Sequence, residues 1–149
     1  ATLFLDSANV EDHLRQMEEI AAKDGTTLFL TTHHIYQGMV SYHLCDYEVA
    51  IQHFYSAKKT LKSVLGLSDT VMYEFYFSLS ILARAIKSKS IPGKQKRMVK
   101  ATMAFLKKLS GQCPENFKTQ YLLLRAEWEW FNNKLNGERH SNVWPPGLS

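Results

Sequence analysis

The chain has 149 residues, of which 45% are hydrophobic and 12% aromatic, and its net charge is +4. That length suits one domain, and the apolar content is high enough to bury a core, which excludes an intrinsically disordered chain. No apolar run approaches the roughly 20 residues that cross a bilayer, and no secretory leader opens the chain, so we expect a cytoplasmic protein outside the membrane.

The first half of the chain predicts three helices, because its apolar residues recur with a helical period. The first lies between Val10 and Gly25, and the second runs over about 27–44. A third follows Asp46 and carries its apolar residues on one face. We expect Gly66 to end this third helix in a left-handed conformation.

The second half predicts three more helices. Asp69 is expected to act as the N-cap of the fourth, which ends in a loop over 88–93 that contains Ser, Pro and Gly. The fifth is expected to stop at Gly111. The sixth opens at Pro114, a residue that suits a first helical turn, and is expected to end at Gly137.

About six helices with short connections predict an all-α fold built from antiparallel helical hairpins. No segment shows the period-two alternation of a half-buried strand. We expect one helical domain over residues 1–137, followed by an irregular tail over 138–149, where Pro145 and Pro146 interrupt any helix.

The second and third predicted helices match the spacing of a tetratricopeptide repeat (TPR), a 34-residue helix–turn–helix. Gly38 lies where the first helix needs a small residue for close approach. The recurring aromatic and small positions of the second helix are occupied by Tyr47, Ala50, Phe54 and Ala57. His34 and Cys45 replace the usual tryptophan and turn glycine. This pattern predicts TPR-like hairpins stacked as a right-handed superhelix.

Three blocks carry a longer family resemblance: GMVSYHLCDYEVAIQHFYSAKKTLKSVLG, FYFSLSILA and CPENFKTQYLLLRAEWEW. Over about residues 25–137 the chain resembles the helical-repeat region of very large bacterial signalling proteins. Those proteins join a serine/threonine-kinase-like domain, an AAA-type ATPase, this helical region, a GAF domain and a histidine kinase. The resemblance implies a scaffold or sensory segment for signal transduction. After Gly137 the chain departs from the family, which continues with another hairpin.

In TPR arrays the first helix of each hairpin lines a concave groove. Transferring that geometry to this chain gives five candidate partner-binding residues: Thr32, Ile35, Met39, Tyr42 and His43. The groove has neither the Lys nor the Asn that clamp a peptide carboxylate in the family. We therefore expect it to bind an apolar or aromatic segment of a protein or peptide partner, or of another domain of a larger chain.

Charge is distributed unevenly along the chain. Residues 1–55 carry a net charge of −6, whereas residues 56–111 carry +10. The candidate basic patch consists of Arg84, Lys87, Lys89, Lys94, Lys96, Arg97 and Lys100. Solvated helix faces account for most such runs, and the loop at 88–93 offers no aromatic residues for base stacking. A nucleic-acid-binding module using segment 84–108 is the alternative function, and an acidic protein surface is a further possible partner.

We expect no catalytic site, cofactor or metal. The chain has no glycine-rich phosphate loop, and two cysteines without CxxC spacing exclude a disulfide framework. Two alternative functions remain open: a cysteine hydrolase that uses Cys113 at a helix N-terminus, and a small-molecule sensor. His43 and His53 could meet near the turn at Cys45, but a zinc site needs three or four ligands.

Overall fold

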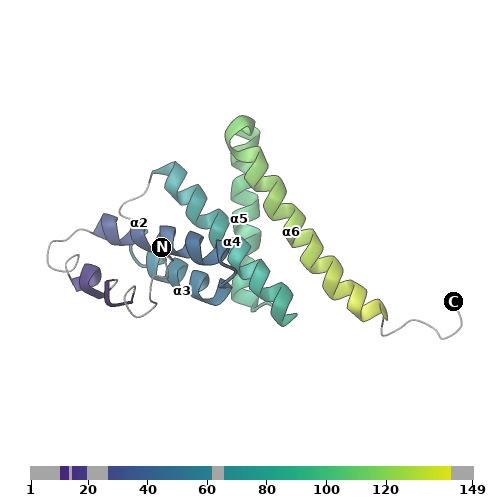
Figure 1. Ribbon diagram of the computed structural model, residues 1–149. Coiled ribbons are helices and arrows are strands. Elements are labelled where there is room, and N and C mark those ends of the chain that lie inside the picture. Colours follow the sequence, from purple (N-terminus) through teal and green to yellow (C-terminus); the bar gives the residue numbers. More distant parts are fainter. Residues whose placement is uncertain (1–10, 14, 20–26, 62–65, 142–149) are drawn as a thin grey trace, which may run out of the picture.

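The computed structural model describes residues 11–13, 15–19, 27–61 and 66–141 (Figure 1). Over these residues the chain is all-helical, as the sequence predicted, and forms no strand. A helical segment at residues 11–13 and 15–19 precedes the longer helices, which makes six helices within the described ranges. No helix of the described part is long and apolar enough to cross a bilayer. The predicted end of the first helix at Gly25 lies outside the described residues.

The first well-defined hairpin consists of α2 (Thr27–His43) and α3 (Tyr47–Lys58). Asp46 caps α3, because its Oδ1 accepts a hydrogen bond from the Val49 backbone N–H at 3.4 Å. The turn is closed by two backbone bonds, from Cys45 N–H to the Tyr42 carbonyl and from Asp46 N–H to the Ser41 carbonyl, both 2.9 Å. This is the Schellman pattern, and Cys45 adopts its left-handed position with φ 62°.

The third helix ends earlier than the sequence predicted. It stops at Lys58, and Gly66 instead precedes α4 (Leu67–Ser88), with an extended backbone of φ −67° and ψ 169°. Asp69 is therefore not the N-cap but lies in the first turn of α4, where a carboxylate interacts favourably with the helix dipole.

The last two helices are α5 (Gly93–Gln112) and α6 (Pro114–Ser141). The predicted loop over 88–93 and the predicted start at Pro114 are confirmed. The predicted end at Gly137 is wrong, since α6 continues to Ser141. Glycine ends a helix only where its backbone takes a left-handed conformation. Gly137 stays helical, so α6 continues through it.

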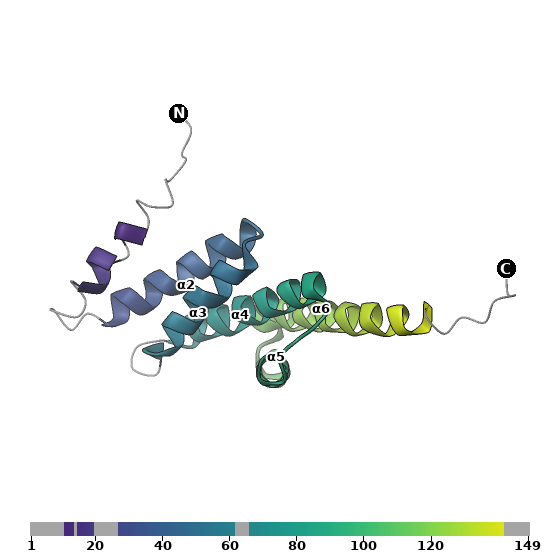
Figure 2. The ribbon, with the colours of Figure 1, turned by 90° about the horizontal axis from the view of Figure 1, so that it is seen from below.

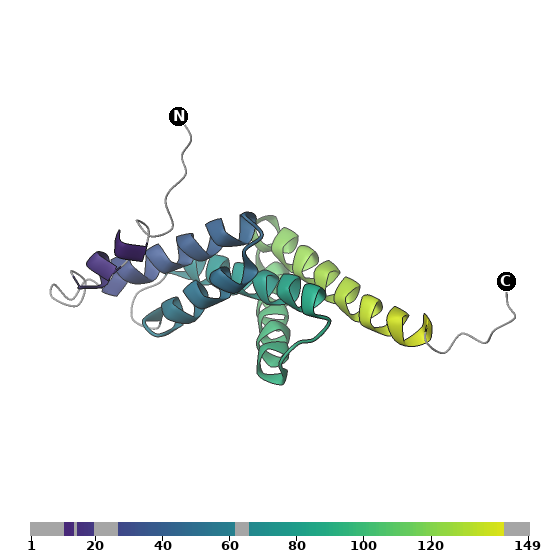
Figure 3. The ribbon, with the colours of Figure 1, turned by 60° about the horizontal axis from the view of Figure 1, so that its bottom comes forward.

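The second hairpin, α5/α6, lies across α4 from the α2/α3 hairpin (Figure 3). In Figure 1, α5 is upright, whereas α4 and α6 run diagonally, and Figure 2 shows α5 end-on, so α5 crosses both helices obliquely. The core is formed mainly by α4, whose buried aromatic residues contact the other helices. Phe54 of α3 stacks on Phe77 at 5.5 Å between ring centroids and meets Tyr73 edge-on at 5.9 Å. Burial of these large rings supplies much of the packing that joins the first hairpin to α4.

Candidate binding groove

A first hollow lies between α2 and α4. Three predicted groove residues line it, Thr32, Ile35 and Met39, and α4 contributes Asp69 and Met72. Its volume of about 30 Å³ is that of about one water molecule, so it is a dimple in a surface rather than an enclosed ligand cavity. The steps of three and four residues between the α2 side chains bring them to one face of that helix.

A second, larger hollow lies between the N-terminal halves of α4 and α6. Its volume is about 390 Å³, and it is lined by Ser68, Val71, Met72, Asn116, Phe117 and Gln120. Met72 lines both hollows. The two hollows are therefore neighbours on one face, which is formed by α2, α4 and α6. We call this face the α2–α4–α6 groove. The Gln120 side-chain carbonyl is buried there and has no hydrogen-bond partner within the described structure.

The other two predicted groove residues, Tyr42 and His43, lie in an aromatic cluster farther along α2. The Tyr42 ring is 5.7 Å from Tyr47 and 5.6 Å from Tyr76, measured between centroids. His43 Nε2 lies 3.3 Å from the Tyr76 hydroxyl. The cluster therefore joins α2, α3 and α4 just beyond the first hollow, and all five predicted residues lie on α2 at or near the groove.

The electrostatics of this cluster disfavour further negative charge. Burial, followed by the Glu127 carboxylate, raises the pKa of Tyr42. A hydrogen bond to the Cys45 thiol, together with burial, raises the pKa of Tyr47 to about 12. A tyrosine hydroxyl is protonated at neutral pH in any case, and the raised pKa values keep both hydroxyls protonated further into alkaline solution. Lys87 lies over the Tyr47 ring, with Nζ 4.8 Å from the centroid, in an arrangement suited to a cation–π interaction.

The repeat positions lie at the contact between α2 and α3. Ala50, Phe54 and Ala57 are fully buried, while Tyr47 is partly buried in the aromatic cluster. A Cβ atom at Gly38 would lie 2.7 Å from Cζ of Phe54, which is closer than carbon atoms can approach. Only glycine therefore leaves room for the Phe54 ring against the backbone of α2 at this position.

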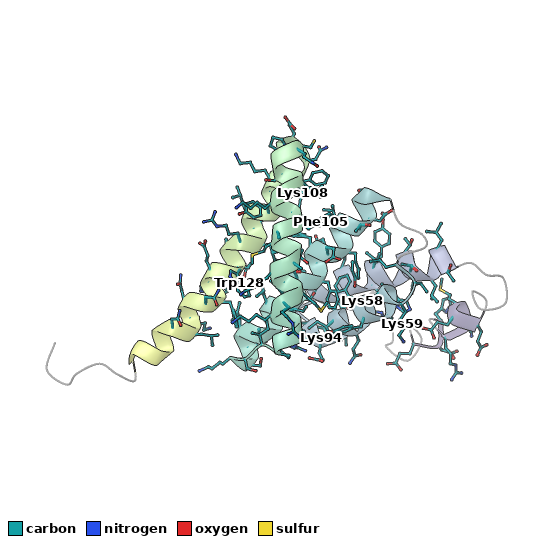
Figure 4. All side chains as sticks on the ribbon, turned by 180° about the vertical axis from the view of Figure 1, so that it is seen from behind. Lys58, Lys59, Lys94, Phe105, Lys108 and Trp128 are labelled. Atoms are coloured by element: carbon teal, nitrogen blue, oxygen red, sulfur yellow. The ribbon has the colours of Figure 1, made fainter. Side chains whose placement is uncertain are left out.

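The basic segment is divided between exposed and structural cations. Lys94, Lys96, Arg97 and Lys100 are exposed along α5. Lys89 is also exposed and has a left-handed backbone with φ 57° at the end of α4. Figure 4 shows Lys94 and Lys108 toward opposite ends of α5, and Lys58 and Lys59 at the end of α3.

Arg84 does not belong with the exposed cations. Its guanidinium donates to Gln95 Oε1 and lies 3.6 Å from the Glu48 carboxylate. Gln95 is buried and donates to the Tyr55 hydroxyl at 3.3 Å. Arg84 thus connects α3, α4 and α5 through polar contacts, so removing it would disturb packing as well as surface charge.

The contacts between histidines differ from the contact that the sequence suggested. His53 does not meet His43 near Cys45; its Nδ1 lies 3.2 Å from Nδ1 of His34. Burial, followed by the neighbouring His34 and His33, lowers the pKa of His53 to about 4. Within the described ranges, no group of three or more His, Cys, Asp or Glu side chains is placed to hold a metal. These histidines pack the α2/α3 interface.

Cys113 lies at the start of α6, as expected. Its backbone carbonyl accepts from the N–H groups of Asn116 and Phe117, and its sulfur accepts a hydrogen bond from the Asn116 side chain at 3.2 Å. The Glu115 carboxylate lies 3.7 Å from the same sulfur. These contacts give Cys113 a structural role in the N-terminal cap of α6.

Sequence reasoning missed a third hollow, between α5 and α6. Its volume is about 240 Å³, and it is lined by Met103, Ala104, Lys107, Tyr121, Arg125, Trp128 and Glu129. A signal was available in the spacing, because Tyr121 and Trp128 are seven residues apart, as are Lys100 and Lys107. That interval returns each helix to nearly the same face. Only the packing of α5 on α6 shows that the two pairs meet.

The geometry therefore offers two separate surfaces, the α2–α4–α6 groove and the hollow between α5 and α6. The first is lined mainly by apolar and aromatic side chains, and the second combines aromatic rings with cations. Comparison with protein-family models, with curated proteins and with solved structures finds no match to this chain.

Proposed function

We propose that this chain is a non-catalytic protein-interaction module that holds an apolar segment of a partner protein, or of another domain, in the α2–α4–α6 groove. The resemblance to the helical-repeat region of bacterial signalling proteins supports a role as a cytoplasmic scaffold or sensory segment. TPR-like stacking of the hairpins belongs to the same proposal.

The observation that carries the proposal is the position of Met72 in both hollows of the groove. A ligand that covers Met72 contacts α2, α4 and α6 together. Each of these helices is held by core contacts: α2 by Gly38 against Phe54, α4 by its buried Phe77 and Ile81, and α6 by its buried Leu124 and Phe131. A wall that is already ordered loses little conformational entropy on binding, which leaves more of the contact energy as affinity.

The side chains of the groove indicate the chemistry of the occupant. Ile35, Met39 and Met72 offer apolar surface, and methionine adapts to irregular ligand shapes. Val71 and Phe117 extend this apolar lining into the larger hollow. An apolar peptide segment fits this lining.

Selection from a random-peptide phage library tests the proposal. We expect the folded chain to enrich peptides that share apolar residues, and the selected peptide to lose most of its affinity for a Met72→Lys variant. Leu122→Lys is the matched control, since Leu122 is an exposed apolar residue of α6 that lines neither hollow of the groove. Enrichment of no common sequence, or equal loss in both variants, would count against the groove.

A further inference from the structure

The hollow between α5 and α6 has an aromatic floor and a basic rim. Tyr121 and Trp128 of α6 are both partly buried against the core and both line the hollow. Lys107 lines it from α5, and Lys100 Nζ lies 5.9 Å from the centroid of the Trp128 ring. The rings therefore lie beside cations that come from the other helix.

The basic rim extends along the helix beyond the hollow. Exposed cations of α5 include Lys96, Arg97, Lys100, Lys107 and Lys108. No acidic residue occurs anywhere in α5. At 1.5 Å per residue, the distance along the helix from Arg97 to Lys108 is about 16 Å.

One acidic group lines the hollow. Glu129 Oε1 accepts a hydrogen bond from Nε of Arg125 at 2.9 Å, and both side chains are exposed. The Arg125 cation offsets the negative charge of Glu129. The lysines of α5 therefore determine the sign of the local electrostatic potential. An anionic ligand therefore approaches a net positive rim.

We propose that the hollow between α5 and α6 binds single-stranded nucleic acid. One base stacks on the ring of Trp128 and another on the ring of Tyr121, while the phosphates follow the lysine row of α5. Every nucleobase has a flat aromatic face, so this combination binds single strands with little sequence preference. An acidic polypeptide would use the lysines but leave the aromatic floor without a stacking partner, which is why the rings favour nucleic acid.

Fluorescence anisotropy of labelled oligo(dT) and oligo(U), at about 50 mM and about 200 mM salt, measures the proposed binding. We expect saturable binding that weakens steeply with salt. The two oligomers distinguish DNA from RNA within the same chemistry. Poly-glutamate is the competitor that carries negative charge without bases, and we expect it to displace the oligomers only weakly.

The chain offers a matched pair of tryptophan–lysine contacts for the mutational test. Lys134 Nζ lies 5.7 Å from the Trp130 ring centroid on the same helix, but neither residue lines the hollow between α5 and α6. We expect Trp128→Leu to weaken binding by about tenfold, and Trp130→Leu to leave it unchanged. Circular dichroism and thermal melting show whether each variant is folded.

A second mutational test changes only charged side chains and leaves the partly buried Trp128 ring in place. Lys100 and Lys107 are exposed, so the double variant Lys100→Gln/Lys107→Gln should fold normally. We expect it to lower the slope of log affinity against log salt by about two, one for each lost phosphate contact. Lys134→Gln should leave the slope unchanged.

Three results would overturn the proposal. One is the absence of oligomer binding at the lower salt concentration. Another is displacement by poly-glutamate as strong as that by unlabelled oligomer, which would point to an acidic protein partner instead. The third is the same affinity and salt slope in the Lys100→Gln/Lys107→Gln and Lys134→Gln variants.

Discussion

The two hairpins of this protein use the same supersecondary plan but differ in how the space between their helices is filled. In the α2/α3 hairpin, Gly38 faces Phe54 so closely that a Cβ atom would overlap the ring. In the α5/α6 hairpin, Met103, Tyr121 and Trp128 line a hollow of about 240 Å³. The first hairpin is thus filled where a ring packs on a glycine, whereas the second has an opening between its helices.

The largest expected effect follows from placing a charge in the close contact. Ala50 is fully buried, so Ala50→Arg should cost more than about 4 kcal/mol and abolish the native fold, because an unpaired cation would enter a packed interface. Circular dichroism and thermal melting would report the loss. Val49→Arg is the control, since the neighbouring Val49 is exposed and should change stability by less than about 1 kcal/mol. A folded Ala50→Arg protein would contradict the close packing of α2 on α3.

Replacing one glycine of each hairpin by alanine adds a methyl group and compares the packing of the two hairpins directly. Gly38→Ala should destabilise the protein by about 1–2 kcal/mol, because overpacking against Phe54 exceeds the gain in helix propensity. Gly111→Ala, in α5, meets no atom within 4 Å and should be neutral or stabilising by up to about 1 kcal/mol. Urea unfolding would measure both.

The source of the Gly38→Ala effect can be isolated with a second substitution. Phe54→Leu shortens the side chain that the new methyl group meets, so Gly38→Ala should cost less in that background than in the parent protein. Equal costs in the two backgrounds would show that the ring is not the obstacle.

Acid should weaken the first hairpin through its histidines. The pKa of His53 is lowered to about 4, whereas the same histidine in the unfolded chain titrates near 6.5. Between these two values the unfolded chain binds more protons, so stability falls as pH is lowered from 6.5 toward 4 and is unaffected above this range. Solvent screening limits this contribution to on the order of 1 kcal/mol.

Urea midpoints measured between pH 7 and pH 4 would reveal this dependence. His33, His34, Glu18 and Lys59 contribute to the charge around the same pair of rings, so His53→Gln should flatten the profile without abolishing it. A profile that His53→Gln leaves unaltered would assign the acid sensitivity to other groups.

The smallest expected effect concerns the turn of the α2/α3 hairpin. Cys45 has a left-handed backbone, which costs an ordinary residue about 1–2 kcal/mol relative to glycine. Cys45→Gly relieves that strain but makes the unfolded chain more flexible and removes the thiol contact with Tyr47, so we expect a net gain of about 0.5 kcal/mol. Differential scanning calorimetry would detect it, and a lowered melting temperature would show that the thiol contact outweighs the strain.

The ends of the helices show where sequence signals are reliable. Asp46 and Pro114 act through their own side chains, one by capping and one by its fixed φ, and both predicted starts are confirmed. Gly66 and Gly137 were expected to end helices, yet the left-handed positions are occupied by Cys45 and Lys89. Glycine permits a left-handed turn without requiring one, so its position alone did not locate the helix ends.

The candidate sites show a similar division. The groove geometry transferred from TPR arrays predicted Thr32, Ile35 and Met39 together, and all three line the first hollow. That transfer could not show that Met72 and Gln120 line the same face, because these residues are distant in sequence. The sequence also grouped Arg84 with the surface lysines, although Gln95 and Glu48 engage it in the folded protein.

The sequence by itself determined the all-α class, most of the helices and the small residues that let α2 approach α3. These features depend on periods of three to four residues and on side chains acting near their own position. The tertiary structure alone decided which faces meet, and it brought Trp128 beside Lys100 and Met72 between α2 and α6. Such pairings depend on how separate helices pack in space, and local spacing carries no information about that.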